Sequence, residues 1–431
     1  MRVRWRRVCP ALCSFGFLLV VSDAAAQTTA ESAAASSHQH DQMQMNMSGE
    51  WTFMQDGIVF VNFNHQGGPR GANELVVPNW WMGMASRDTS RGRVTLTSML
   101  SLDPATVGND GYRELFQAGE ALDGRPLIDR QHPHDLFMQL GASWRVPIGH
   151  STGFTLVGAP VGEPALGPVA FMHRASAADN PTAPLGHHTF DSTHIAFGVV
   201  TAAVDRGQWV VEGSLFNGRE PDEHRWDFDF GPLDSFSGRV WFKPNEEWEL
   251  QVSSGRLKSP EELEPGNIIR STASASWTRK NGQAIASVTA GFGRNDTDHG
   301  ARNAFFVEGA RHADMNTIYG RFEAVQAETA LLLTDAVIEG AAADITDTVL
   351  AFTVGGVRDI LAWRGFEGGL GADMTFYGVP TALQPVYSNH PVSFHVFFRL
   401  RSPVGAMGRM WNMRMSQPIA GHNMPMSHQM R

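Results

Sequence analysis

The sequence predicts an all-β protein: an antiparallel transmembrane β-barrel of about sixteen strands, with flexible tails at both ends. Three observations lead to this prediction. Apolar and polar residues alternate along most segments between residues 51 and 401, and the connections between these segments are alternately short and long. After residue 26, no run of eighteen apolar residues is present that would form a membrane-spanning helix. A closed barrel is the remaining way for such a chain to cross a bilayer.

The first 26 residues are expected to be a signal peptide. The basic start MRVRWRR precedes the apolar stretch VCPALCSFGFLLVV, and the small residues Ala24, Ala25 and Ala26 suit a cleavage site. Both cysteines, Cys9 and Cys13, lie within this segment, so disulfides and thiolate metal sites are excluded from the mature chain. Residues 27–50 are expected to be flexible, and the net charge of -10 argues against nucleic-acid binding.

The alternation of side chains is clear in residues 136–146. One face of this segment carries apolar side chains: Leu136, Met138, Leu140, Ala142, Trp144 and Val146. The other face carries Gln139, Ser143 and Arg145. Such a strand is expected to turn its apolar face to lipid and its polar face to the barrel lumen.

Candidate strands begin near residues 57, 77, 92, 135, 152, 193, 208, 235, 247, 270, 283, 303, 316, 347, 366 and 392. The long connections include residues 103–134, 161–192, 217–234, 257–269, 328–346 and 378–391, and the stretch 328–345 suits a short helix. Short periplasmic turns and long external loops are typical of outer-membrane barrels. An even strand number predicts that both termini, including the tail 402–431, lie in the periplasm.

Several stretches resemble bacterial outer-membrane, porin-like barrel proteins of the uncharacterised type associated with copper and metal resistance. They are LIDRQHPHDLFMQL (127–140), GEPALGPVAFMHR (162–174), NPTAPLGHHTFDSTHIAFGVV (180–200) and EGSLFNGREPDEHRWDFD (212–229). The Met/His-rich front also resembles the copper-resistance protein B family. These resemblances imply a bacterial outer-membrane location and metal handling. One departure is that some thirty residues follow the last strand, which carries Phe397 and Phe398.

The two tails predict a soft-metal site. Thioether sulfur suits Cu(I), and imidazole and carboxylate suit Cu(II). The N-terminal candidates are His38, His40, Met43, Met45 and Met47, and the C-terminal candidates are Met407, Met410, Met413, Met415, His422, Met424, Met426, His428 and Met430. Two alternatives remain open, namely an amphipathic helix over 407–415 and a disordered tail whose methionines have no role.

Two long loops carry a second set of candidate ligands. These are His132, His134 and Asp135 in one loop, and His187, His188, Asp191 and His194 in the other. If both loops fold into the barrel mouth, imidazoles and carboxylates suited to Zn, Cu(II) or Ni would meet. The alternative is a hydrogen-bonded loop network without metal, in which Arg130 and Arg174 pair with the aspartates.

We therefore expect an outer-membrane barrel that handles copper or a similar soft metal, with outer-membrane lipid, the metal ion and periplasmic metal-handling proteins as partners. A general porin-like channel is the alternative, since charged side chains line the predicted lumen. A barrel-embedded hydrolase using Ser192 or Ser235 with a nearby histidine is a third, although no spacing singles out either serine.

Overall fold

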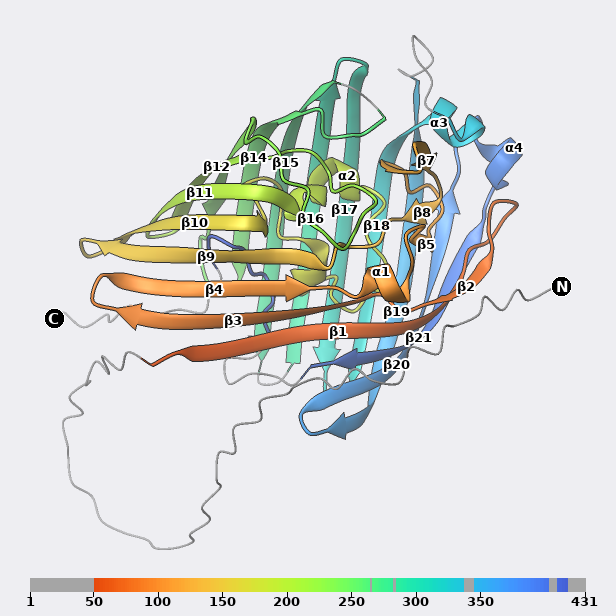
Figure 1. Cartoon of the computed structure of the whole chain (residues 1–431). Helices are drawn as coiled ribbons and strands as arrows, with labels where there is room; N and C mark the ends of the chain where they lie inside the picture. The colour runs from red at the N-terminus through yellow and green to blue at the C-terminus, as the bar shows by residue number, and fades with distance from the viewer. Residues whose placement is uncertain (1–49, 264–265, 282–283, 337–344, 403–408, 418–431) are drawn as a thin grey trace, which may run out of the picture. The chain divides into compact units, whose positions relative to one another are not determined.

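The computed structural model describes residues 50–263, 266–281, 284–336, 345–402 and 409–417. Sixteen long strands in these residues close into one antiparallel barrel, and β1 pairs with β21 to complete the ring (Figure 1). The barrel strands are β1 Thr52–His65, β3 Asn79–Thr89, β4 Gly92–Leu100, β9 Phe137–Ile148, β10 Thr152–Gly162, β11 Ala196–Arg206, β12 Trp209–Phe216, β13 Ser235–Phe242, β14 Trp248–Lys258, β15 Asn267–Asn281, β16 Ala284–Thr297, β17 Gly300–Ala313, β18 Asn316–Glu328, β19 Thr346–Trp363, β20 Phe366–Gly378 and β21 Val392–Arg401.

Shorter elements lie in the connections. They are β2 Asn73–Val76, α1 Asp103–Thr106, β5 Tyr112–Arg113, β6 Glu120–Leu122, β7 Arg125–Leu127, β8 Arg130–Gln131, η1 Phe171–His173, α2 His187–Phe190, η2 Ser192–His194, α3 Thr329–Thr334 and α4 Gln384–Tyr387. No helix in the described ranges is long and apolar enough to cross a membrane.

The predicted fold class is confirmed, and each predicted strand begins within about five residues of an observed one. The alternation of short and long connections fails once. Only Asp298 and His299 separate β16 from β17, where the pattern requires a long loop. The reason is that both strands extend further than the sequence suggested and close in a tight turn.

The outer face of the barrel is apolar and the inner face is polar. Along β12, for example, Val211 and Leu215 are more than half exposed, whereas Glu212 and Ser214 between them are buried. An outward apolar face around a polar interior is the arrangement that a lipid bilayer requires of a barrel.

A β-bulge changes this pattern in β9. Leu100 of β4 pairs with Phe137 and Met99 pairs with Gln139, so Met138 is an extra residue in the ladder. An extra residue in a strand changes which face of the sheet the side chains on one side of the bulge point toward. Met138 is therefore buried in the barrel, and our expectation that it shares the outer face with Trp144 is wrong.

The long loop between β10 and β11 folds into the barrel. From residue 163 to 195, every residue is buried except Glu163, Ala178, His188 and His194, which are partly exposed. Burial of this extent means that the loop lies within the lumen, where α2 lies against β15, β16 and β17 (Figure 1).

Arg174 anchors this loop. Its guanidinium contacts Asp191 of the same loop at 2.9 Å and Glu308 of β17 at 2.6 Å, and all three side chains are about 1% exposed. Arg321 of β18 adds a bond to the carbonyl oxygen of Ala183 at 2.8 Å. Charged groups at such depth are stable only when paired, so these contacts fix the loop to one side of the wall.

Residues 409–417 are also inside the barrel, although we expected them in a free tail. Met410, Met413 and Met415 are buried, and the backbone N–H of Asn412 donates to the carbonyl oxygen of His173 at 2.6 Å. The physical reason is that the apolar side chains of this segment find an apolar region within the lumen, so burying them there removes them from water. The remaining tail residues lie outside the described residues.

Replacing Arg174 with Met should release the loop, because it leaves two buried carboxylates without their cation. Such a loss costs about 3–5 kcal/mol. We expect lower stability and a larger single-channel conductance in planar bilayers. Arg93→Met is the control, since Arg93 pairs with Asp88 at an exposed turn. Equal conductance in both variants would contradict the role of Arg174.

Candidate metal site

Five histidines from two loops meet inside the barrel. His132 and His134 follow β8, and His187, His188 and His194 belong to α2 and η2. Neighbouring rings in this cluster lie 5.3–6.2 Å apart between centroids: His132 with His134, His187 and His188, His134 with His194, and His187 with His188 and His194. Two loops separated by some fifty residues therefore converge on one point.

Local sequence explains how each loop presents its rings. Pro133 has a fixed backbone angle and favours extended backbone in the preceding residue, so His132 and His134 both reach the same cluster. In α2, consecutive residues point in different directions around the helix. His187 consequently faces the interior, with no exposed surface, whereas the neighbouring His188 is partly exposed.

Each of three histidines is held by its Nδ1 atom. His134 Nδ1 lies 2.9 Å from a carboxylate oxygen of Asp103, and His187 Nδ1 lies 2.5 Å from one of Asp191. His194 Nδ1 lies 2.7 Å from the carbonyl oxygen of Asp191. A carbonyl oxygen and an ionised carboxylate can accept hydrogen bonds but cannot donate them. The proton must therefore be on Nδ1 in each of the three rings.

The Nε2 atoms of the same rings are buried and have no hydrogen-bond partner among the described residues. With the proton on Nδ1, each Nε2 offers a lone pair. A buried acceptor without a partner costs about 1–3 kcal/mol, and here three occur together. Metal-bound histidines in proteins show this arrangement, with the second ring nitrogen bound to a carboxylate or carbonyl.

The charge states suit metal binding. Burial lowers the pKa of His187, and burial together with the neighbouring His187 and His134 lowers the pKa of His194 to about 3. Burial raises the pKa of Asp191, but His187 and Arg174 outweigh this and the net shift is downward. At neutral pH, His187 and His194 are thus neutral imidazoles beside the ionised carboxylate of Asp191.

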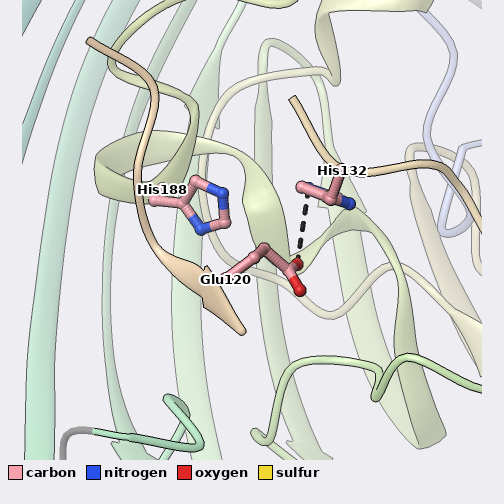
Figure 2. Close-up of side chains that lie close together, drawn as sticks. All are labelled: Glu120, His132 and His188. Atoms are coloured by element: carbon pink, nitrogen blue, oxygen red, sulfur yellow. Dashed lines mark ion pairs between the residues drawn. The ribbon is translucent and has the colours of Figure 1, made fainter. Parts of the chain in front are cut away.

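The rings of His134, His187 and His194 would have to move closer together to share one ion, because they are not among the groups of described residues whose ligand atoms lie within 4.8 Å of one another. Imidazole nitrogens lie about 2.0–2.1 Å from a bound Zn²⁺. A tighter group lies beside them, in which one ligand atom each of Glu120, His132 and His188 falls within 4.8 Å of the other two (Figure 2).

This second group continues toward solvent. His132 Nε2 lies 3.5 Å from Glu120, and His188 Nδ1 lies 3.2 Å from Glu220. His188, Glu120 and Glu220 line a cavity of about 510 Å³ together with Glu261. Burial lowers the pKa of His188, but Glu220 and Glu120 outweigh it and leave the pKa raised. The cavity therefore gives a cation an acidic approach to the histidines.

Asp135, one of the predicted ligands, pairs with an arginine. Its carboxylate lies 3.4 Å from Arg225, which also binds Glu120 at 2.9 Å. Burial raises the pKa of Asp135 to about 6, against the effect of Arg225. Asp191 pairs with Arg174, as the metal-free alternative proposed, and it also orients His187. The partner of Asp135 is Arg225, which that alternative did not name.

The other predicted ligands divide into two groups. Met410, Met413 and Met415 are buried in the barrel and distant in sequence from the histidine loops. The rest lie outside the described residues: His38, His40, Met43, Met45, Met47, Met407, His422, Met424, Met426, His428 and Met430.

Sequence reasoning missed the carboxylates that support the histidines. Asp103, Glu120 and Glu220 lie in long loops among other charged residues, and no spacing links them to a histidine. Only the fold brings them to the site.

The serines considered for a hydrolase do not form Ser–His pairs. The Ser192 hydroxyl donates to Glu220 at 3.0 Å and accepts from Arg270 at 2.9 Å. Ser235 is fully buried and accepts the backbone N–H of Lys258 at 3.0 Å. Both serines lie inside the barrel, away from the lipid-facing wall.

Comparison with known proteins identifies the fold of this chain but no family to which it belongs. No protein-family model matches the chain, and no curated protein sequence matches it. OmpF of Salmonella typhi, solved in complex with daunomycin, is 6% identical with a TM-score of 0.50, and the match covers 83% of this chain and 99% of OmpF. The anion-selective porin from Comamonas acidovorans is 12% identical with a TM-score of 0.47, covering 82% of this chain and 100% of the porin. The closed barrel of sixteen strands and its likeness to OmpF show that the chain has the fold of an outer-membrane porin.

The histidine pKa values predict acid sensitivity of the metal-free protein. An ordinary histidine titrates near pH 6.5, and His194 in the folded protein near pH 3. Between pH 6.5 and pH 3, the unfolded chain binds a proton at this histidine that the folded protein does not bind. The free energy of unfolding should therefore fall as the pH drops through this range. His194→Asn keeps a donor for the Asp191 carbonyl and should flatten this decline. Thermal unfolding with a chelator, at several pH values, measures the effect; an equally steep decline in the variant would contradict it.

Proposed function

We propose that this protein is an outer-membrane barrel that binds a transition-metal ion, copper foremost, at the histidine cluster inside its lumen. One observation carries the proposal: the three buried Nε2 atoms of His134, His187 and His194, each on a ring whose Nδ1 is already bound. An ion at their centre would satisfy all three acceptors at once.

The donor set selects the kind of metal. Neutral imidazoles with a nearby carboxylate suit Zn, Cu(II) and Ni and disfavour Mg and Ca. Asp103 and Asp191 hold two of the rings in the correct tautomer, which strengthens the rings as ligands. The acidic cavity at Glu120 and Glu220 would raise the local concentration of cations at the entrance.

The apolar outer face and the porin fold support a location in the bacterial outer membrane. With short turns at the periplasmic end, both termini would lie on the periplasmic side. The Met/His tails would then collect metal in the periplasm, from solution or from periplasmic metal-handling proteins, and the barrel would hold it within the membrane.

A general porin-like channel is the second candidate, because sixteen strands are enough to enclose an aqueous pore. The buried loop 163–195 argues against a wide one. Conductance separates the two functions, since a general channel should conduct without metal and regardless of the histidines.

The triple variant His134→Asn, His187→Asn and His194→Asn tests the proposal. Asparagine keeps a donor where Nδ1 stood and removes Nε2, so the loops should keep their contacts. We expect Cu(II) and Zn(II) affinity at this site to fall by on the order of 100-fold or more. Isothermal titration of the refolded full chain measures it.

His150→Asn with His390→Asn is the matched control, because both histidines are exposed. Heat-modifiable gel mobility should be the same in all three proteins and reports that the barrel has formed. Unchanged metal affinity in a folded triple variant would overturn the proposed site.

A further inference from the structure

Methionines from four adjacent strands line one part of the lumen. Met82 of β3 pairs across the sheet with Met99 of β4, and Met84 of β3 pairs with Met54 of β1. Met138 joins them from the bulge in β9. Since side chains two residues apart share a face, Met82 and Met84 point the same way, into the barrel.

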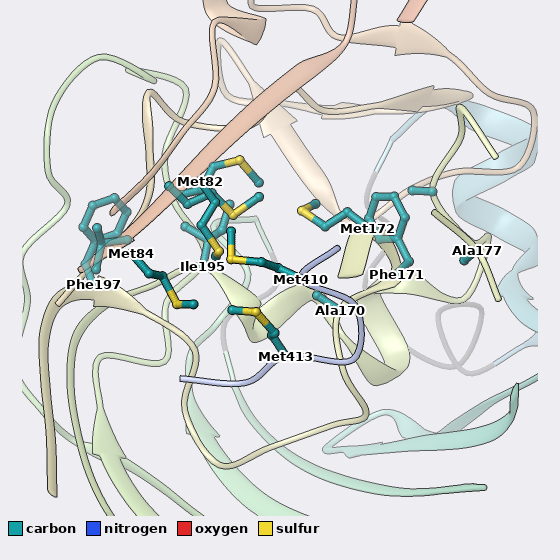
Figure 3. Close-up of a cluster of buried hydrophobic side chains, with 14 residues drawn as sticks. Met82, Met84, Ala170, Phe171, Met172, Ala177, Ile195, Phe197, Met410 and Met413 are labelled. Carbon is teal, nitrogen blue, oxygen red and sulfur yellow. The ribbon is translucent and has the colours of Figure 1, made fainter. Parts of the chain in front are cut away.

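Two further segments bring methionines to the same place. Met172 comes from the inward loop, and Met410 and Met413 come from the C-terminal segment. Figure 3 shows their thioether groups gathered between the strands and these segments. We call the seven buried residues Met82, Met84, Met99, Met138, Met172, Met410 and Met413 the methionine cluster.

The concentration of methionine here is local. Half of the fourteen buried residues in this apolar group are methionines. The apolar group around Leu383 and Tyr387 contains none, and the group around Leu257 contains only Met415. Those two groups are built mainly from leucine, valine, alanine and aromatic side chains. Methionine as a flexible gap filler explains one or two such residues, but not seven in one place.

The ring of His173, which packs edge-on against Trp80 with centroids 5.1 Å apart, lies at the edge of the methionine cluster. His173 follows Met172 directly, is 7% exposed and lines a small pocket with Met410. Its Nδ1 atom is buried and has no hydrogen-bond partner among the described residues.

The methionine cluster adjoins the histidine site. Phe171 and Ile195 belong to its apolar group, and the Phe171 ring lies 5.7 Å from the His187 ring. His134 shares a pocket with Phe171 and Met172. Soft sulfur donors and harder nitrogen donors are thus neighbours along the interior of one barrel.

We propose that the methionine cluster, with His173 at its edge, is a binding site for Cu(I) inside the barrel. Thioether sulfur is a soft, uncharged ligand, which suits Cu(I) and its redox-inert analogue Ag(I) and not Zn(II). The inference rests on the proposed function only for the choice of copper as the metal. The proposed Cu(I) site includes Met410 and Met413 of the C-terminal segment and lies next to the histidine cluster.

The test uses the variant Met82→Leu, Met84→Leu, Met99→Leu and Met138→Leu in the refolded full chain. Exchange of Met for Leu conserves volume and usually costs less than about 1.5 kcal/mol, so the barrel should form. Met315→Leu with Met374→Leu is the control, because both residues are largely exposed. Ag(I) and Cu(I) are titrated under a competing chelator, and sulfur coordination is followed by X-ray absorption.

We expect the four-site variant to lose about one equivalent of tightly bound Ag(I) or Cu(I) with its sulfur signal, while the control loses none. Because both proteins keep the terminal methionines, any metal bound there contributes equally. Binding equal to that of the wild type would overturn the inference and leave the methionines as packing.

The triple histidine variant distinguishes the proposed histidine site from the proposed methionine site. If it loses Cu(II) but keeps Cu(I), both sites stand. If no Cu(II) or Zn(II) binds the wild type but the methionine-dependent Cu(I) site is present, the histidine proposal fails and this inference holds.

Discussion

The ion pairs of Arg174 are the contacts on which the interior of this protein depends. A loop of more than thirty residues can be buried in a barrel only if its charged and polar groups find partners there. Arg174 joins Asp191 within the loop to Glu308 on the wall, and it does so with almost no exposed surface. Arg270 of β15 adds to this anchor, because its guanidinium donates to the Ser192 hydroxyl at 2.9 Å and to the His188 carbonyl oxygen at 2.7 Å.

Asp191 links this anchor to the metal site. One of its carboxylate oxygens binds Arg174, the other binds His187, and its carbonyl oxygen binds His194. The same residue therefore fixes the loop, selects the tautomer of one ring and orients a second. Asp191 consequently couples two properties of the protein. It stabilises the buried loop, and it orients two histidine rings of the proposed metal site.

The strands were predictable from sequence because each lies between lipid and lumen, and this environment imposes a period of two on its side chains. The histidine loops were identified as candidates, yet their meeting and their carboxylate partners depend on contacts between distant segments. Asp103 and Glu120 illustrate this, since nothing in their neighbourhood marks them as histidine partners. The direction of Met138 was mispredicted for another reason. Methionine counts as apolar, so the pattern placed Met138 toward lipid, and a single bulged residue reverses that direction.

The central claim is that histidine Nε2 atoms bind a metal ion inside the barrel, and electron paramagnetic resonance of bound Cu(II) tests it most directly. With one equivalent of Cu(II) in the refolded full chain, the account predicts hyperfine coupling to at least three imidazole nitrogens and slow loss of the signal to an external chelator. A spectrum dominated by oxygen ligands, or one that is the same after replacement of His134, His187 and His194, would contradict it.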